Sequence, residues 1–326
     1  MSECMISTLL FPHCKHVLNW VDFCPPRSLR LIAVQKEVAP MTLRVPRYWA
    51  RAQREVELRS GQVLDLTRFG WSERSFEEAL RSAQSGLEEL VSRVMTGEKL
   101  DHYAYGVRAP LREELIQEIR QDGNLLGAVT RNAYGSLVLN TAQVMFADID
   151  FPAVRKKGGL LARLFGAKKV EEADPADAAL ARVAEWASRN DRYSFRVYRT
   201  HSGLRLLFTS HTFNPTGPEA RRILEELGSD PLYVKLCQVQ ECFRARLTPK
   251  PWRIGIESPK LSYPYANAQK EAEAAKWVSR YDTRRARFST CRFKGEFGRR
   301  EVHPEVGPVV ELHDELCQVG INQPLA

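Results

Sequence analysis

The run Val144-Met-Phe-Ala-Asp-Ile-Asp150 decides the fold of this chain, because it has the pattern of a buried strand that ends in two acidic residues. Its apolar start is typical of a central strand, and Pro152 follows its end. Further along the chain, Ser194-Phe-Arg-Val-Tyr-Arg199 and Leu204–Ser210 predict two more strands, joined by the turn Thr200-His-Ser-Gly203.

Helices are predicted between and after these strands. Ala178–Asn190 has its apolar residues on one side, and Pro218–Leu227 has acidic and basic residues on its outer side. Upstream, Ala128–Arg131 and Ser136–Asn140 predict a hairpin, because Asn132-Ala-Tyr-Gly135 suits a tight turn. The order of strand, helix, strand, turn, strand and helix predicts a compact α+β fold.

The flanking regions are predicted to be mainly helical. Ser72 or Ser75 can begin a helix whose apolar residues continue at helical spacing, and Leu111–Ile119 predicts a second one. Met41 is an alternative start, which would leave residues 1–40 untranslated; as part of the chain we expect them to be poorly ordered. The predicted organisation is an extension at 1–40, a mainly helical region at 41–127, an α+β core at 128–260 with a basic insert at 154–177, and a basic, helical and partly irregular region at 261–326.

Composition places the chain among ordinary globular proteins. Its 326 residues, of which 44% are hydrophobic, suffice for a core without disulfides. No uncharged apolar run approaches the ~20 residues of a membrane-spanning helix, so no membrane partner is expected. The seven cysteines are odd in number and lack Cys-x-x-Cys spacing, which favours reduced thiols and a cytoplasmic location.

Positive charge is concentrated in one part of the chain. The net charge is +8, and residues 243–300 contain fifteen Lys or Arg against five Asp or Glu. Such a region attracts phosphate-bearing partners such as nucleotides or nucleic acid through a long-range field. The alternative is a solvated surface that keeps the protein in solution.

Asp148 and Asp150 form the first candidate site. Side chains alternate between the two faces of a strand, so both carboxylates project to one side and can reach one ion. Two carboxylates suit Mg²⁺ or Mn²⁺, and a metal that bridges substrate phosphates would make the pair catalytic. The alternative is a turn or a helix cap.

The turn between the two later strands is the second candidate site. Arg199 and Arg205 flank it with guanidinium groups that suit bidentate contacts to phosphate. Two hydroxyl groups and a glycine complete the predicted nucleotide-binding or phosphate-binding set: Thr200, Ser202 and Gly203.

These segments resemble the core of the archaeo-eukaryotic primase superfamily, in particular its bacterial and phage primase-polymerase branch. The resemblance covers about residues 128–210 and rests on Phe146-Ala-Asp-Ile-Asp150 and Tyr198-Arg-Thr-His-Ser-Gly-Leu-Arg-Leu-Leu-Phe208. It implies an RRM-like mixed or antiparallel sheet flanked by helices, a divalent metal on the Asp-x-Asp strand, and nucleotidyl transfer to a 3′ hydroxyl.

The chain departs from this family at one position. The nucleotide-binding histidine of the family lies on the strand after the Ser-Gly turn, and the matching position here is Leu206, which cannot hold a triphosphate. His201 lies in the turn, earlier than the pattern requires. Chain order alone gives three candidates for the family's third carboxylate: Asp230, Glu241 and Glu257.

A competing resemblance is to phosphatases of the haloacid-dehalogenase type. These also place Asp-x-Asp after an apolar strand and a Ser or Thr after a second strand, as Thr209 follows Phe208 here. Their second Asp is followed by a loop that opens with Thr or Val, whereas this chain has Phe151-Pro152. No later acidic pair stands out, so this resemblance is the weaker of the two.

A basic and aromatic segment follows the predicted core helices. Arg244 and Arg246 would share a face of an extended segment. Trp252, between Lys250 and Arg253, could stack on a nucleobase. The alternative is a core tryptophan beside ordinary surface arginines.

The other cysteines and histidines are expected to be structural. Cys237 and Cys242 are predicted to be buried thiols. His303, His313 and Asp314 are expected on a helix surface or in the core. Residues of the kinds that bind zinc also occur near the N-terminus, but their spacing matches no common finger pattern: His13, Cys14, His16 and Cys24.

The sequence therefore leaves three functions open. The first is a primase-polymerase-like protein that binds divalent metal and a nucleotide or nucleic-acid phosphate, with nucleotidyl transfer as its reaction if it is an enzyme. The second is a non-catalytic nucleic-acid-binding or regulatory protein on the same fold, which Leu206 favours. The third is a metal-dependent phosphatase.

Overall fold

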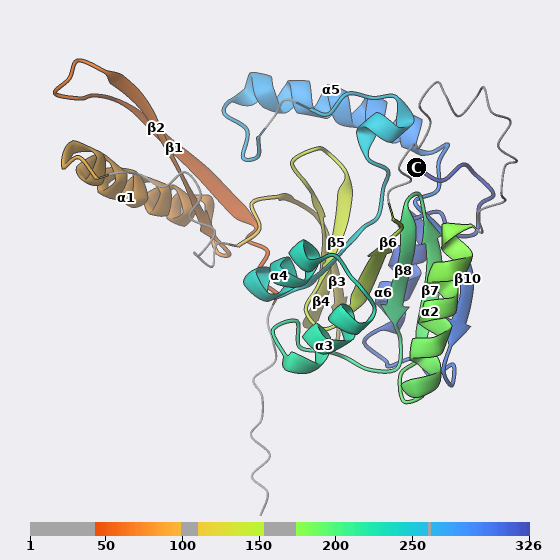
Figure 1. Ribbon diagram of the computed structural model, residues 1–326. Coiled ribbons are helices and arrows are strands. Elements are labelled where there is room, and N and C mark those ends of the chain that lie inside the picture. The colour runs from red at the N-terminus through yellow and green to blue at the C-terminus, as the bar shows by residue number, and fades with distance from the viewer. Residues whose placement is uncertain (1–42, 99–109, 153–173, 260–261) are drawn as a thin grey trace, which may run out of the picture. The chain divides into compact units, whose positions relative to one another are not determined.

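The computed structural model describes residues 43–98, 110–152, 174–259 and 262–326 (Figure 1). The extension predicted at 1–40, with its candidate zinc ligands, lies outside the described residues. Most of the basic insert predicted at 154–177 also lies outside them, and its last residues already belong to a helix that begins at Pro175.

A four-stranded antiparallel sheet carries Asp148, Asp150 and the Ser-Gly turn. Every residue of its strand β8 is buried, as expected of a strand that lies between two others. The three strands predicted in this part of the chain are confirmed. In spatial order the sheet consists of β10 (Cys291–Phe297), β7 (Phe195–Thr200), β8 (Gly203–Phe208) and β6 (Phe146–Asp150).

A second four-stranded antiparallel sheet contains the predicted hairpin. Its turn is closed by the backbone N–H of Asn132, which donates to Ser136 O at 3.0 Å, and Gly135 takes a positive φ of 91°. In spatial order the strands are β3 (Glu114–Gln121), β4 (Asn124–Arg131), β5 (Leu137–Thr141) and β9 (Phe243–Arg246).

Helices cover the two faces of the first sheet. Trp186 of α2 (Pro175–Arg189) packs against Phe208 of β8, with ring centroids 6.1 Å apart. His313 of α6 (Gly307–Leu316) packs against Phe146 of β6, with centroids 5.7 Å apart. Because neighbouring residues of a strand point to opposite faces, one face carries Asp148 and Phe146 and contacts α6, while the other contacts α2 (Figure 1).

The remaining helices connect and flank these strands. Asp230 begins one of them with its side chain, whose Oδ1 accepts from the backbone N–H of Leu232 at 2.8 Å. The helix predicted from Pro218 is confirmed as α3. These elements are α3 (Pro218–Glu226), α4 (Pro231–Gln240), the short 3₁₀ helix η2 (Pro251–Ile254) and α5 (Ala268–Arg285).

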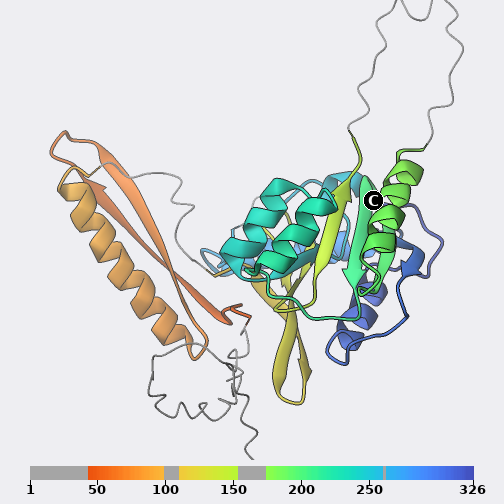
Figure 2. The same cartoon turned by 60° about the horizontal axis from the view of Figure 1, so that its bottom comes forward.

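The mainly helical region predicted at 41–127 is wrong for most of its length. Only α1 (Phe76–Met95), capped by Ser75 as predicted, is a described helix there. It packs on a long antiparallel hairpin of β1 (Tyr48–Glu57) and β2 (Val63–Ser72) (Figure 2). The charged residues of the hairpin favour a helix by propensity, but burial of alternate apolar residues against α1 overrides that preference.

Two further secondary-structure predictions are corrected. The segment predicted as a helix at Leu111–Ile119 is largely strand β3, whose apolar residues pack as an edge of the second sheet. The region predicted to be helical at 261–326 contains α5 and α6, but β10 lies between them and completes the first sheet. Both sheets therefore extend beyond the core predicted at 128–260.

The predicted α+β class is confirmed. The described residues form six α-helices and antiparallel sheets. Among these residues, no helix combines the length and apolar character needed to cross a bilayer.

The contact between β2 and α1 yields a test of the corrected N-terminal fold. A Cβ added to Gly70 would collide with backbone atoms of Ala79 and Ala83, which cannot give way as a side chain can. We expect Gly70→Ala to lower the free energy of unfolding by about 3 kcal/mol. Gly86, on α1 with open space around its Cα, is the matched control, and Gly86→Ala should stabilise by about 1 kcal/mol in urea unfolding. Equal tolerance of both changes would argue against this packing.

Candidate functional site

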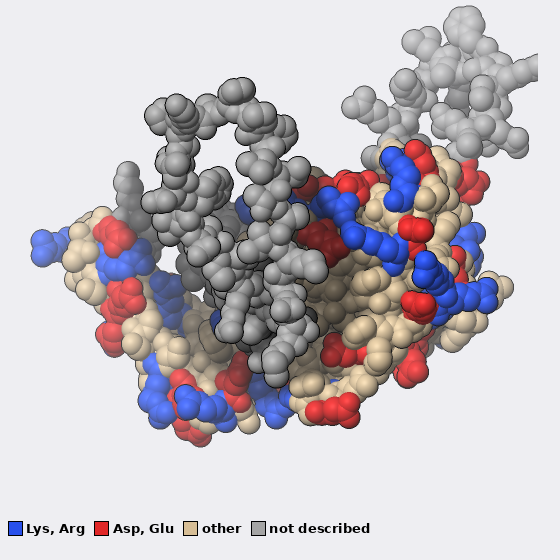
Figure 3. All heavy atoms as spheres, turned by 90° about the horizontal axis from the view of Figure 1, so that it is seen from below, with Lys and Arg blue, Asp and Glu red and all other residues tan. Residues whose placement is uncertain are grey.

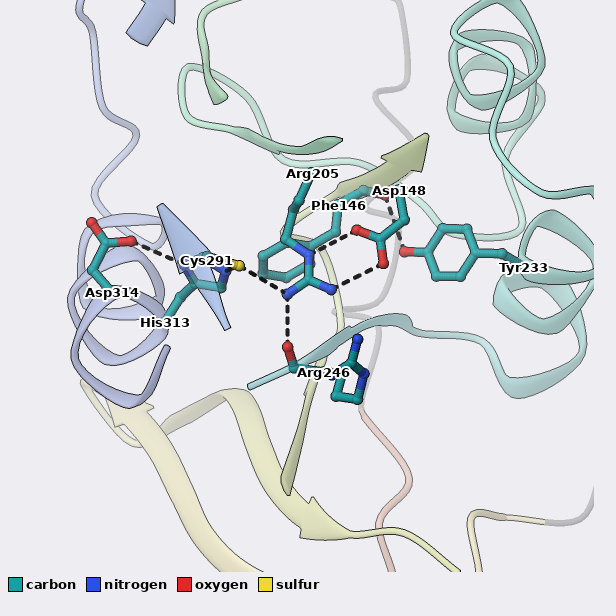
Figure 4. A network of polar contacts seen from close by, with 8 residues as sticks. All are labelled: Phe146, Asp148, Arg205, Tyr233, Arg246, Cys291, His313 and Asp314. Atoms are coloured by element: carbon teal, nitrogen blue, oxygen red, sulfur yellow. Dashed lines mark hydrogen bonds and ion pairs between the residues drawn. The ribbon is translucent and has the colours of Figure 1, made fainter. Parts of the chain in front are cut away.

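Asp148 forms a bidentate ion pair with Arg205 on the neighbouring strand. The two residues face each other in the register of β6 and β8. Arg205 Nε donates to one carboxylate oxygen at 2.7 Å and Nη2 donates to the other at 2.9 Å (Figure 4). The Arg205 side chain is 2% exposed, whereas that of Asp148 is 38% exposed. The pair therefore reaches from the protein interior to the surface.

The remaining donor of Arg205 is also used inside the protein. Its Nη1 donates to the backbone carbonyl of Arg246 on β9 at 2.8 Å and lies 3.8 Å from Cys291 Sγ on β10 (Figure 4). Burial acts to lower the pKa of Arg205, but the neighbouring groups, Asp148 foremost among them, together raise it. Arg205, predicted as a phosphate ligand, is instead engaged with Asp148 and with the second sheet.

Asp150 is the exposed last residue of β6 and lies near other charged groups. Its pKa is raised by partial burial, and then by the negative charges of Asp148 and Asp230, while Lys250 and Arg253 act in the opposite direction. Asp230, one of three candidates for a third carboxylate, thus lies near enough to act on Asp150.

These carboxylates do not by themselves form a compact set of metal ligands. Among the described residues, the group of three whose ligand atoms lie within 4.8 Å of one another is Cys291, His313 and Cys317. Asp148 already has both oxygens bonded to Arg205, and Asp230 uses one oxygen to cap α4. Binding of Mg²⁺ or Mn²⁺ remains a prediction.

Positively charged groups gather beside Asp150. Burial lowers the pKa of His201, and so, in decreasing order, do four neighbouring cations. Burial and two of these cations likewise lower the pKa of Lys250. We call the five groups the basic cluster: Arg199, His201, Arg246, Lys250 and Arg253.

The permanent cations of the basic cluster make no ion pair with any described acidic residue. Arg253 donates to Ser202 Oγ at 3.0 Å, and Arg246 to the backbone carbonyl of Thr248 at 3.2 Å. Both acceptors are neutral. By contrast, the face in Figure 3 shows Lys and Arg interspersed with Asp and Glu. The cluster is thus a concentration of positive charge that the neighbouring Asp150 offsets only in part.

An exposed aromatic residue adjoins the basic cluster. Trp252 is 53% exposed. Its ring meets Tyr134 edge to face at a centroid distance of 5.4 Å, and Lys250 Nζ lies 5.5 Å from its centroid. The expectation of a core tryptophan at this position is wrong, because Trp252 lies on η2 with its ring largely in solvent.

Several predicted site residues have other surroundings. Arg244 donates to both carboxylate oxygens of Glu113, at 2.8 and 2.7 Å, and is mostly buried. Thr200 ends β7 opposite Cys291. Gly203 is required by packing, because a Cβ there would collide with the carbonyl oxygen of Ile149.

The structure also gives the positions of the other residues discussed from the sequence. Leu206 is buried on the face opposite to Asp148. Thr209, the hydroxyl residue of the phosphatase comparison, is 4% exposed. Cys237 and Cys242 are buried free thiols as predicted, and burial raises the pKa of each to about 12.

Cys291, His313 and Cys317 form a group that was not predicted from the sequence. Cys291 lies on β10, far from the other two in sequence. His313 and Cys317 are four residues apart near the end of α6, a spacing that places them on one face of a helix. This spacing is the feature of the sequence that indicates a possible pair of metal ligands.

No family model, no curated protein and no solved structure matches the chain. Its function is therefore argued from the site alone.

The ion pair predicts a strong dependence of stability on Asp148. Asp148→Asn removes the charge that compensates buried Arg205, so we expect the free energy of unfolding to fall by about 3 kcal/mol in urea denaturation. Glu225→Gln is the control, because Glu225 pairs with Arg221 on the exposed surface of α3, and it should cost less than about 0.5 kcal/mol. Replacing both partners, in Asp148→Asn/Arg205→Met, should recover most of the loss. A small effect of Asp148→Asn would contradict the assigned role.

Proposed function

We propose that this chain binds a single-stranded nucleic acid, with the phosphate backbone on the basic cluster and a base on Trp252. The observation that carries the proposal is the convergence of four permanent cations and His201 without an acidic partner among the described residues other than the neighbouring Asp150. Like charges held together repel one another, and a bound phosphate lowers that repulsion.

The aromatic residues favour a single strand over a duplex. Trp252 is 53% exposed beside Lys250, and unpaired bases stack on such aromatic rings without a fixed sequence. Tyr134 supports the ring from its edge. In a duplex, stacked bases do not reach a side chain in this way.

The proposal is binding without catalysis on a primase-like, RRM-like core. Asp148 is bonded at both oxygens to Arg205, which disfavours its use as a metal ligand. Leu206 is buried away from that face. The described cysteines are free thiols, which agrees with a reducing compartment such as the cytoplasm.

Binding should depend steeply on salt and on the cluster. We expect Lys250→Gln/Arg253→Gln to weaken binding of a labelled single-stranded oligonucleotide roughly tenfold at about 0.1 M salt, because two phosphate contacts are lost. The slope of log affinity against log salt concentration should become shallower by about 1.4. Fluorescence anisotropy over a range of salt concentrations measures both.

Matched variants separate the site from net charge. Arg221→Gln/Arg222→Gln removes the same charge from α3, where both arginines are paired with glutamates, and should leave the affinity nearly unchanged. Trp252→Ala should weaken single-strand binding by about 1–3 kcal/mol and affect duplex binding less. Equal losses in the two double variants would reject the basic cluster as the site.

A second candidate function is metal-dependent nucleotidyl transfer. The specific observation in its favour is that Asp148 and Asp230 raise the pKa of Asp150, after burial, because a divalent cation would relieve this repulsion. Asp150 and the second oxygen of Asp230 are the groups that would hold Mg²⁺ or Mn²⁺. The metal would bridge triphosphate oxygens, and the basic cluster would orient the phosphates.

This second function has its own test. It requires that calorimetric titration of Mn²⁺ detects metal binding that is strengthened by a nucleoside triphosphate, and that Asp150→Ala abolishes it. Purified protein should then extend a primed template with labelled nucleotide. Absence of both signals, with oligonucleotide binding intact, would leave the non-catalytic function alone.

A further inference from the structure

Three side chains of the types that bind metal ions meet in the interior, on the face of the first sheet that contacts α6. Cys291 comes from β10, His313 from α6, and Cys317 from the residue that ends α6. All three are fully buried, and their ligand atoms lie within 4.8 Å of one another. Cys291 Sγ and His313 Nε2 are 4.0 Å apart. Two ligand atoms of one tetrahedral zinc ion lie roughly 3.6–3.8 Å apart, so the group would contract by up to about 1 Å on binding.

His313 is oriented as a ligand would be. Its Nδ1 lies 2.9 Å from Asp314 Oδ1, and since a carboxylate accepts, Nδ1 carries the proton. The lone pair of Nε2 is then directed toward Cys291 (Figure 4). Asp314 is itself fixed by Arg196, whose Nη1 lies 3.0 Å from Oδ2. Metal-bound histidines commonly have such a carboxylate on their second nitrogen.

The charge balance also favours a cation. Both thiols are fully buried, and the guanidinium of Arg205 near Cys291 is already neutralised by Asp148. A divalent ion neutralises two thiolates and leaves the imidazole neutral. The positive charges in this part of the interior are then both neutralised, that of the metal ion by the two thiolates and that of Arg205 by Asp148.

We propose that Cys291, His313 and Cys317 bind a thiophilic metal ion, with Zn²⁺ as the ion that two thiolates and an imidazole ordinarily select. Among the described residues no fourth His, Cys, Asp or Glu joins the group, so the fourth position falls to water or a small exogenous donor. The ion would fasten α6 to β10 beside Arg205. This inference is independent of the proposed function, since it involves no residue of the basic cluster.

The test begins with metal analysis of the full chain. Protein purified under reducing conditions without chelator, or reconstituted with Zn²⁺ and desalted, should contain about one equivalent of metal per chain by mass spectrometry, which also distinguishes zinc from copper. Co²⁺ in its place should give thiolate-to-metal charge-transfer bands and visible d–d bands of tetrahedral geometry. Cys317→Ser should lose the metal and the charge-transfer bands.

Control variants locate the ion. Cys237→Ser removes another buried thiol and should keep the metal. Asp314→Asn keeps all three ligands, so the protein should fold, but the affinity for Zn²⁺ should fall about tenfold or more. Metal that persists in Cys317→Ser but is lost in Cys14→Ser/Cys24→Ser would place the ion near the N-terminus and overturn the proposal.

Two other results would also overturn it. One is wild-type protein that binds neither Zn²⁺ nor Co²⁺ in the reduced state. The other is a count of free thiols, made on denatured protein without reductant, that gives the same number for the wild type as for Cys291→Ser/Cys317→Ser, although the wild type has two more cysteines. That count would mean that the two cysteines form a disulfide instead.

Discussion

The buried guanidinium of Arg205 is the constraint on which the core depends. An ionised side chain in the interior is tolerated only when it is paired and its donors are bonded. Here the partners come from three different strands: Asp148 on β6, the carbonyl of Arg246 on β9, and Cys291 on β10. The strands must therefore approach β8 in one arrangement, and β9 brings the second sheet with it.

The same pair fixes the register of the first sheet. A shift of one residue between β6 and β8 would turn Asp148 toward Leu204 or Leu206 and leave Arg205 buried without a partner. It would also move the apolar residues of β8 from the α2 side of the sheet to the α6 side. A one-residue shift in register is thus disfavoured by two independent free-energy terms, one electrostatic and one hydrophobic.

The sequence predicted the elements whose pattern is local. The strands around Asp148, the 132–135 turn and α1 follow from alternation, turn residues and helical spacing. Strands β1 and β2 were not predicted, because the burial of their apolar residues depends on the packing of α1 against them. The basic cluster could not be predicted from the sequence. Its residues come from segments at or near β7, β9 and η2, and their proximity depends on how separate elements are arranged in space.

At the candidate site, the functional interpretation depends on which residue of β8 faces Asp148. Counting along the chain matches the histidine of the primase-like pattern with Leu206, yet in the sheet Leu206 is directed toward α2 and cannot meet the carboxylates. Arg205 is the residue of β8 that faces Asp148. An arginine at that place is always charged, so it can hold a carboxylate but cannot exchange a proton near neutral pH. The position of β8 that faces Asp148 therefore holds a fixed charge and no titratable group, which disfavours acid–base chemistry at that carboxylate.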